Sequence, residues 1–199
     1  MPVRKPGRRI ALVEAAFQAI AADGFEGLRT RDVAADAGVN IATLHYYFPT
    51  KEALIAGVVE YVMGRFRSTL TGTSSPDHLR SHLHAVRSLL RSEPEIGLVM
   101  GELALRSSRD PALAKVIADA NAVWHRTLRG LLRKEAREGR LNQDVDPDDV
   151  ASLVMATLTS MTLPTVASGR RIDQALRQLE RLLGLDSQKP GAQRNKSSN

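Results

Sequence analysis

The stretch from Thr30 to Phe48, TRDVAADAGVNIATLHYYF, decides the fold. It reads as two short helices joined by a tight turn. Two short helices that cross at a steep angle need a small side chain at the crossing, a residue tolerant of positive φ in the turn and a shared apolar residue. Ala34, Gly38 and Leu44 supply these three in that order. The pattern therefore predicts a helix-turn-helix, whose second helix is the one to enter a major groove of DNA.

The side chains that the second helix shows to solvent fit the same use. Thr43, His45 and Tyr46 can donate to phosphates or reach base edges. Ile41 and Ala42 offer apolar contact to the methyl groups of thymine. The sequence therefore places polar and small apolar groups together on the face that would meet a base pair.

Residues at the helix ends complete the predicted surface. Asn40 can cap the second helix, and Arg31, at the start of the first helix, can reach guanine. Lys51 starts the following helix, where its ammonium group and the helix N-terminus together favour a phosphate. An exposed Lys or Thr on a helix usually just faces water, so it is the set of residues, and no single one, that favours nucleic acid.

Helical periodicity dominates the rest of the chain, and no strand alternation of useful length occurs. Apolar residues recur at helical spacing from Ile10 to Ile20, and Asp23-Gly24 stops that first helix. The clearest break is the run from Thr71 to Asp77, beyond which we expect a helical body. Its helices are predicted at about 79–91, 95–107, 111–138, 147–168 and 171–183. The fold class is therefore all-α, with a small N-terminal head on a larger body.

The net charge of +6 over 199 residues is concentrated at the two ends. The basic residues responsible are Arg4, Lys5, Arg8, Arg9, Lys189, Arg194 and Lys196. Without these seven, 21 basic residues stand against 22 acidic ones, so a partner that is an anion would be held by a leading arm and a few placed groups. The arm can equally be a solubilising end, and both interpretations stay open.

Several classes of protein are disfavoured by what the sequence lacks. It has no cysteine, which removes disulfide scaffolds, Cys-ligated zinc and thiol nucleophiles. No hydrolase, phosphate-loop, dinucleotide or zinc-protease motif occurs, so we expect no enzyme, no cofactor and no metal. His78 and His82, one turn apart, can share a metal only if Asp77 or Glu102 joins them, and beside the break we expect them to be solvated.

One uncharged segment, from Val150 to Gly169, is long enough to span a bilayer. About half of it is polar, and its apolar residues recur at helical spacing. We therefore expect a buried or interface helix and no contact with a membrane.

Residues from about Arg9 to Val62 resemble the DNA-binding head of the tetracycline-repressor (TetR) family of bacterial regulators. The resemblance rests on Gly24-Phe25, Thr30–Ala34, Ala37–Val39 and Thr43–Leu54, of which the run from Tyr46 to Leu54 is highly specific. The body resembles the family's effector half more loosely, through Gly139-Arg140-Leu141 and Asp144–Pro147 followed by two apolar helices.

The resemblance implies a homodimer that holds two heads over successive major-groove faces of a roughly palindromic DNA operator, in the bacterial cytoplasm at the nucleoid. By the family pattern, phosphates are contacted at Thr30, Tyr46, Tyr47 and Lys51. Bases are read at Arg31, Ile41, Ala42, Thr43 and His45. The family commonly has tyrosine where this chain has His45, which leaves the base preference at that step open.

The resemblance also divides the chain into parts with separate roles. They are a basic flexible arm at 1–8, a helix-turn-helix head with its linker helix at 9–70, an effector-binding and dimerisation domain at 77–185 and a disordered tail at 186–199. The effector, for which an apolar molecule is favoured, would bind a cavity in the body and change the separation of the heads through the helix from Lys51 to Arg67. Side chains that can line such a cavity are Met63, Phe66, Met100, Leu103, Trp124 and Met155.

Two apolar stripes are wide enough to pair with a second chain. One runs from Val150 to Met161, and the other comprises Ile172, Ala175, Leu176, Leu179, Leu182 and Leu183. They predict a four-helix seam around a two-fold axis, although both can also be buried within one chain.

The function predicted from these features is a one-component transcriptional regulator, most often a repressor in this family, that leaves its operator when a small molecule occupies the body. An architectural DNA-binding protein without effector is one alternative, since it would use the same head. An all-helical ligand carrier or enzyme, which would use only a cavity, is the other.

Overall fold

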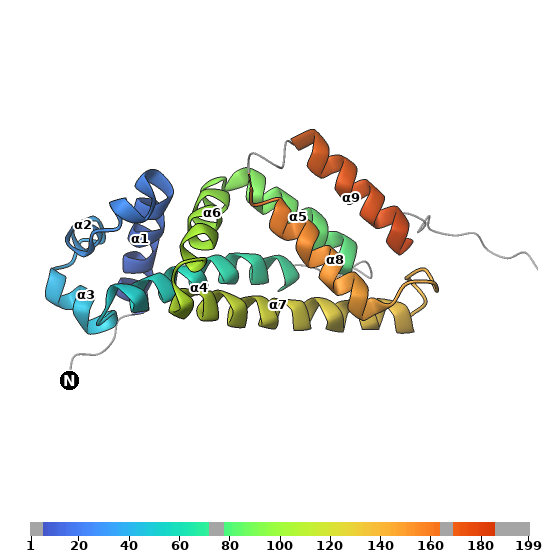
Figure 1. Ribbon diagram of the computed structural model, residues 1–199, viewed down its shortest axis with the longest axis horizontal. Coiled ribbons are helices and arrows are strands. Elements are labelled where there is room, and N and C mark those ends of the chain that lie inside the picture. The colour runs from blue at the N-terminus through green and yellow to red at the C-terminus, as the bar shows by residue number, and fades with distance from the viewer. Residues whose placement is uncertain (1–5, 72–77, 164–168, 186–199) are drawn as a thin grey trace, which may run out of the picture.

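The computed structural model describes residues 6–71, 78–163 and 169–185, and over these residues the chain forms helices and no strand (Figure 1). The helices of the head and its linker are α1 (Pro6–Gly27), α2 (Thr30–Asp36), α3 (Ile41–Tyr47) and α4 (Lys51–Thr71). Those of the body are α5 (His78–Ser92), α6 (Glu95–Ser107), α7 (Pro111–Arg137), α8 (Pro147–Ser160) and α9 (Gly169–Leu183). The predicted all-α fold is confirmed. Residues 1–5 of the expected arm and the expected tail lie outside the described residues.

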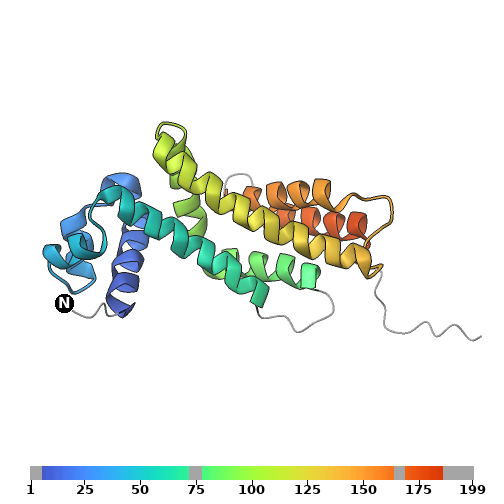
Figure 2. The same ribbon diagram turned by 90° about the horizontal axis from the view of Figure 1, so that it is seen from below.

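The molecule is elongated, with α2 and α3 at one end and α9 toward the other (Figure 1). Helix α4 belongs to both halves, because it packs on α1 in the head and on α5 and α7 in the body. Figure 2 shows α7 running along the body beside α4, with α8 on its other side. Helix α6 packs on both α1 and α7, so it is a second connection between head and body.

One continuous apolar core joins the two halves. Leu12, Phe17 and Ile20 recur at helical spacing on α1 and are buried. In the body, Phe66 of α4 stacks on Trp124 of α7, with ring centroids 5.3 Å apart. Burial of such large rings contributes most of the packing energy of a helical interface.

Three helix ends differ from the sequence prediction. Helix α1 is interrupted at Gly24 (φ 63, ψ −162), where we expected it to stop, but it resumes and ends at Gly27. Helix α1 begins at Pro6, so residues 6–8, which we expected in the arm, belong to the helix. Proline is favoured at the first helical position, where its missing N–H would have no partner. Helix α8 ends at Ser160 and not near 168, because the proline after Leu163 disfavours helical φ and ψ at Leu163.

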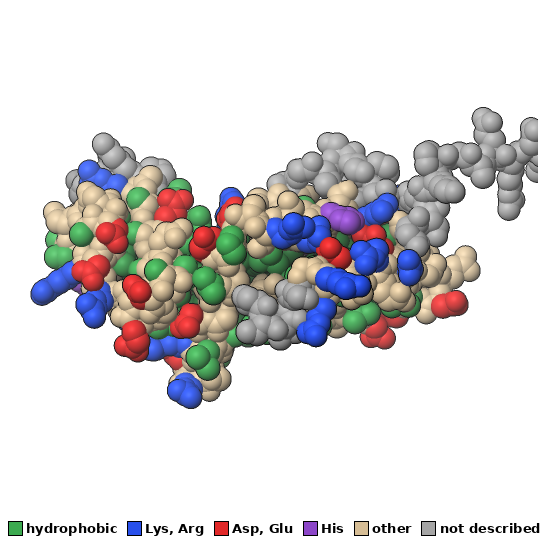
Figure 3. Space-filling model, turned by 90° about the horizontal axis from the view of Figure 1, so that it is seen from above, with side chains coloured by type: hydrophobic (Ala, Val, Ile, Leu, Met, Phe, Trp, Pro, Cys, Tyr) green, Lys and Arg blue, Asp and Glu red, His purple; other side chains and the backbone are tan. Residues whose placement is uncertain are grey.

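The charged groups between α5 and α9 form a ladder of ion pairs. Glu180 lies 2.6 Å from His84 Nε2 and 3.6 Å from Arg80 Nε, and Arg87 pairs with Asp173. Figure 3 shows basic, acidic and histidine side chains gathered together on this side of the body. The pairs hold α9 in place along α5.

No helix in the described part of the chain is long and apolar enough to cross a membrane. The uncharged segment from Val150 onward forms α8, whose Val154 and Leu158 are buried. It packs on α7 as an ordinary helix of the body.

The expectation that His82 is solvated is wrong. Leu79, His82, Leu83 and Val86 share one face of α5, and all four are fully buried. His82 Nδ1 lies 2.8 Å from Thr69 Oγ1, whose hydroxyl donates to the Phe66 carbonyl, so Nδ1 carries the proton. Its Nε2 has no hydrogen-bond partner among the described residues. Burial lowers the pKa of His82 to about 4, against a smaller opposite effect of a hydrogen bond with Thr69.

We expect His82 to make the protein lose stability in mild acid. The pKa of His82 is about 4 in the folded state, against an ordinary value of 6.5, so the unfolded chain binds the proton first. His82 therefore leaves the free energy of unfolding unchanged above pH 6.5. Its protonation lowers that free energy by about 3 kcal/mol as the pH drops toward 4. Urea unfolding at pH 8, 6, 5 and 4 measures this loss in the wild type.

The matched control is His82→Asn, whose side-chain amide can still donate to Thr69 but does not titrate. The free energy of unfolding of this variant should be lower at pH 8 and fall less steeply below pH 6.5. Parallel profiles for the two proteins would show that His82 does not cause the acid sensitivity.

Candidate DNA-binding surface

The helix-turn-helix predicted from Ala34, Gly38 and Leu44 is present. Ala34 and Leu44 are buried, and they are the small residue and the apolar plug between α2 and α3. Gly38 has φ +64, and a residue with a Cβ in that conformation is strained by about 1–2 kcal/mol. The Val39 N–H donates to the Ala34 carbonyl at 2.9 Å, which closes the turn.

Asn40 fixes the first turn of α3. Its Oδ1 accepts from the backbone N–H of Thr43 at 2.8 Å and from the Thr43 hydroxyl at 2.9 Å. The predicted cap is therefore confirmed. Because both polar groups are engaged in the cap, Asn40 and Thr43 set the orientation of α3 before any partner binds.

The far side of α3 is held by α1 and α4. Phe48, which ends α3, is buried against Gly57 of α4, where an added Cβ would lie 2.9 Å from the Phe48 ring. The Arg9 guanidinium lies over the same ring, 5.3 Å from its centroid, and pairs with Glu60 at 2.9 Å. Arg9 of α1, one of the basic residues near the N-terminus, thus links α1 to Phe48 and to Glu60 of α4.

Four of the predicted contact residues of α3 lie on the open face of that helix, whereas Thr43 is half-buried and its hydroxyl donates to Asn40. Ile41, Ala42, His45 and Tyr46 are exposed, with Tyr46 49% accessible. Tyr47 is half-buried and meets the Tyr46 ring edge-on, with centroids 5.3 Å apart. The two tyrosine rings therefore pack together at the C-terminal end of α3, and the face is open at Ile41, Ala42 and His45.

Predicted residues at the starts of α2 and α4 gather with His45 of α3 at a hollow of about 660 Å³. Thr30, Arg31, His45 and Lys51 all line this hollow, together with Arg29. The N-terminus of α4 also opens here, where the Thr50 hydroxyl accepts from the Ala53 N–H at 3.1 Å. Asp32 also lines the hollow, but three cationic side chains and a helix N-terminus outweigh its single carboxylate. The surface is therefore suited to phosphate oxygens.

Arg29 was not predicted from the sequence. It precedes α2 with an extended backbone, and its side chain is exposed. Its position directly before Thr30 and Arg31 could have indicated its role, because consecutive residues at the start of a helix lie close together in space.

The six side chains predicted to line an effector cavity are not brought around one opening. Met63, Phe66, Leu103 and Trp124 are buried in the apolar core. Met100 is partly buried, and Met155 lines a shallow groove between α7 and α8. A cavity of about 440 Å³ lies elsewhere, between α5, α6, the end of α8 and the start of α9, and none of the six lines it.

A braced helix-turn-helix with an open recognition helix, carried at one end of a helical body, defines a helix-turn-helix DNA-binding protein. Residues 12–58 match the family described as bacterial regulatory proteins, tetR family. Residues 75–184 match the C-terminal region of the BetI-type transcriptional repressors. The chain belongs to the TetR family and is a DNA-binding transcriptional regulator.

Individual relatives are distant, and they cover from about a third to nine-tenths of the chain. The HTH-type transcriptional regulator UidR of Escherichia coli (strain K12) is 20% identical over 163 residues, which are 80% of each chain. The HTH-type transcriptional regulator BetI of Rhizobium meliloti is 36% identical over 63 residues, 32% of this chain and 31% of that protein. A crystal structure of a TetR-family regulator from Rhodococcus sp. superposes with a TM-score of 0.78 and 24% identity, covering 90% of this chain and 100% of that one. This likeness shows the shared fold.

Proposed function

We propose that this regulator binds a roughly palindromic operator as a homodimer, represses transcription there and is released when a small molecule binds its body. The observation that carries the proposal is the open face of α3 beside the hollow lined by Arg29, Arg31, His45 and Lys51. Such a regulator acts on the chromosome, in the bacterial cytoplasm. The division into a head at 9–70 and an effector-binding and dimerisation domain at 77–185 is part of the same proposal.

The contacts with DNA follow from where the groups lie. Helix α3 enters the major groove, where Ile41, Ala42 and His45 meet base edges. Lys51 and Arg29, at the starts of α4 and α2, bind phosphates on either side of the groove, as Thr30, Tyr46 and Tyr47 do along its edge. Arg31 reaches a base from the start of α2.

Exposed leucines on α8 and α9 support the dimer. Leu153 and Leu163 are exposed on or just after α8, and Leu182 is exposed on α9. By contrast Leu176 and Leu179 of the predicted stripe are buried within the chain. The four-helix seam therefore uses the outward faces of α8 and α9, and it places two heads on one DNA duplex.

Selection of bound sites from random duplex DNA with the purified protein tests the proposal. A palindromic site with half-sites about one helical turn apart, or a multiple of it, is the expected outcome. No enrichment of any sequence, or enrichment of a single half-site bound by one chain, would exclude a dimeric operator-binding regulator.

Lys51 and Arg31 are expected to affect DNA binding in different ways. Lys51→Ala should weaken binding to operator and random DNA alike and lower the slope of log K against log salt by about one per head. Arg31→Ala should cost about 1–3 kcal/mol on operator DNA, relax the preference at one base pair and change random binding little. Salt titrations of both variants on both DNAs measure the difference. Equal losses by Arg31→Ala on the two DNAs, or an unchanged slope for Lys51→Ala, would reverse the assigned roles.

A further inference from the structure

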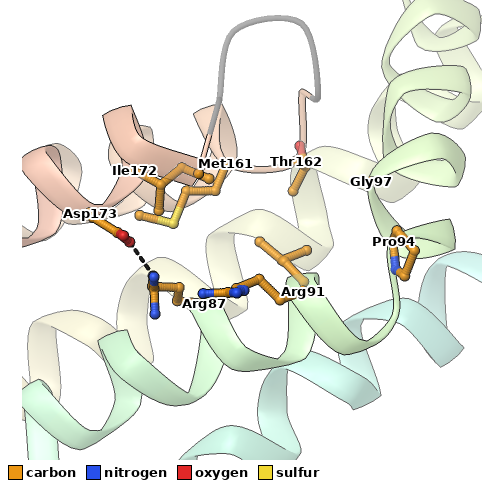
Figure 4. A pocket seen from close by; sticks show the side chains of 10 residues that line it. Arg87, Arg91, Pro94, Gly97, Met161, Thr162, Ile172 and Asp173 are labelled. Atoms are coloured by element: carbon orange, nitrogen blue, oxygen red, sulfur yellow. Dashed lines mark ion pairs between the residues drawn. The ribbon is translucent and has the colours of Figure 1, made fainter.

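The cavity of about 440 Å³ in the body has the size of a small-molecule site. Helix α5 forms one side of it, the first turn of α6 and the end of α8 close it, and the first turn of α9 lies across from α5 (Figure 4). It is separate from the apolar core around Phe66 and Trp124.

Its charge is positive. Arg87 and Arg91 both extend into the cavity from α5, and Arg87 pairs with Asp173 of α9 (Figure 4). Within the described residues no acidic side chain lies at ion-pair distance from Arg91, and residues 164–168, which join α8 to α9, contain no acidic residue. Gly169, the first residue of α9, also lines the cavity, so the positive end of that helix adds to the charge.

The remaining walls are mostly apolar. Met161 and Ile172 face the two arginines across the cavity (Figure 4). Leu90 of α5 also lines it. The hydroxyl of Thr162 is engaged, because it donates to the Thr159 carbonyl at 2.7 Å. The cavity thus offers one cationic side and one apolar side.

We infer that this cavity is the effector site and that it takes an organic monoanion, a carboxylate with an apolar portion. The inference rests on the proposed function, which requires an effector in the body. The carboxylate binds the free guanidinium of Arg91, whose planar donors match two carboxylate oxygens, with Arg87 beside it. The apolar portion lies against Met161 and Ile172. The two arginines, opposed by the single carboxylate of Asp173, disfavour a cationic ligand.

Helix α6 connects this site to the head. Gly97 lines the cavity, and an added Cβ there would lie 2.9 Å from the Thr162 carbonyl oxygen, so α6 and the end of α8 are in close contact. Further along α6, the Glu102 carboxylate lies against Gly24 of α1, and the Arg106 guanidinium lies 5.3 Å from the centroid of the Phe25 ring. An occupant that moves α6 relative to Thr162 therefore moves the contact between body and head.

A charge-matched ligand series tests the site. Octanoate, 1-octanol and octylammonium share one apolar chain and differ in charge, and calorimetric titration into the full-length protein measures their affinities. We expect octanoate, or its six-, ten- or twelve-carbon homologue, to bind at least tenfold more tightly than the alcohol and amine of equal length. Failure of every carboxylate to bind at millimolar concentration, or equal binding of the amine, would overturn the inference.

Variants locate the binding. Arg91→Gln should weaken octanoate binding by about tenfold or more, and Arg91→Lys should restore part of it, because the charge returns without the bidentate geometry. The matched control is Arg177→Gln, which removes an exposed arginine of α9 that does not line the cavity. Equal affinities for octanoate in Arg91→Gln and Arg177→Gln would place the carboxylate elsewhere and overturn the inference.

DNA binding is measured separately so that the two proposals can fail separately. Wild-type affinity for the selected operator without any carboxylate tests the proposed function alone. Saturating octanoate, or the homologue that binds, should then lower operator affinity in the wild type and not in Arg91→Gln. A carboxylate that binds at Arg91 but leaves operator affinity unchanged would show that the cavity is not the effector site.

Discussion

Ile41→Glu is expected to lower operator affinity by about 100-fold without lowering the stability of the protein. Ile41 is the first residue of α3 and is 36% exposed, on the face proposed to enter the major groove. A carboxylate there faces the phosphates of both strands, and such like-charge contacts cost several kcal/mol. A loss of about 3 kcal/mol in binding free energy corresponds to a 100-fold loss of affinity. The same carboxylate is favourable for the helix, because an acidic residue in the first turn interacts well with the helix dipole.

Gel-shift or anisotropy titration with operator DNA measures the affinity, and thermal unfolding without DNA measures the stability. Ala104→Glu, at an exposed position on α6 of the body, adds the same charge away from the head. It should change operator affinity by less than threefold. If Ile41→Glu and Ala104→Glu weaken binding equally, the effect comes from total charge, and α3 is not the groove-binding helix.

The head could be predicted from the sequence because its determinants are local. Ala34, Gly38 and Leu44 lie within eleven residues of one another, and the cap made by Asn40 involves only its own helix. A small residue at the helix crossing, a positive φ and a capping side chain can each be predicted from the type of a single residue. Helix-turn-helix geometry follows from these without any long-range contact.

The cavity in the body could not be predicted for the opposite reason. It forms where residues far apart in the sequence meet, such as Arg87 of α5 and Asp173 of α9. No local sequence pattern around either residue indicates that the two are in contact. The sequence therefore indicated a cavity only through its large aromatic and flexible methionine side chains. Of these, Phe66 and Trp124 pack into the core, as such side chains usually do. The burial of His82 could have been predicted, since it lies on the same helix face as Leu79, Leu83 and Val86, whose burial follows from their spacing.

Gly139-Arg140-Leu141, which resembles the family pattern of the body, has a structural explanation. Gly139 has φ +70 and ends α7, and the Arg140 N–H donates to the Glu135 carbonyl at 2.9 Å, which completes a Schellman motif. Leu141 is buried next to it. The Arg140 guanidinium turns back onto the carboxylates of Glu135 and Glu138, and the hydrogen bond with Glu135 raises the pKa of Arg140.

Arg140→Ala is therefore expected to destabilise the folded protein by about 3–5 kcal/mol. The Glu135 side chain is only 1% exposed, and both of its oxygens accept from Arg140. Removing the arginine leaves a buried carboxylate without its charge partner, which costs far more than the loss of an exposed ion pair. Urea unfolding at pH 7.5 measures the change, at equal protomer concentration because the stability of the proposed dimer depends on concentration.

Arg133→Ala is the matched control, because Arg133 pairs with Asp148 on the surface and Asp148 keeps Arg129. It should cost less than about 1 kcal/mol. Adding Glu135→Gln to Arg140→Ala should recover part of the loss, since the remaining buried group is then uncharged. If Arg140→Ala costs no more than Arg133→Ala, the carboxylate of Glu135 finds water or another donor in the variant, and the pair does not hold the end of α7 against the body.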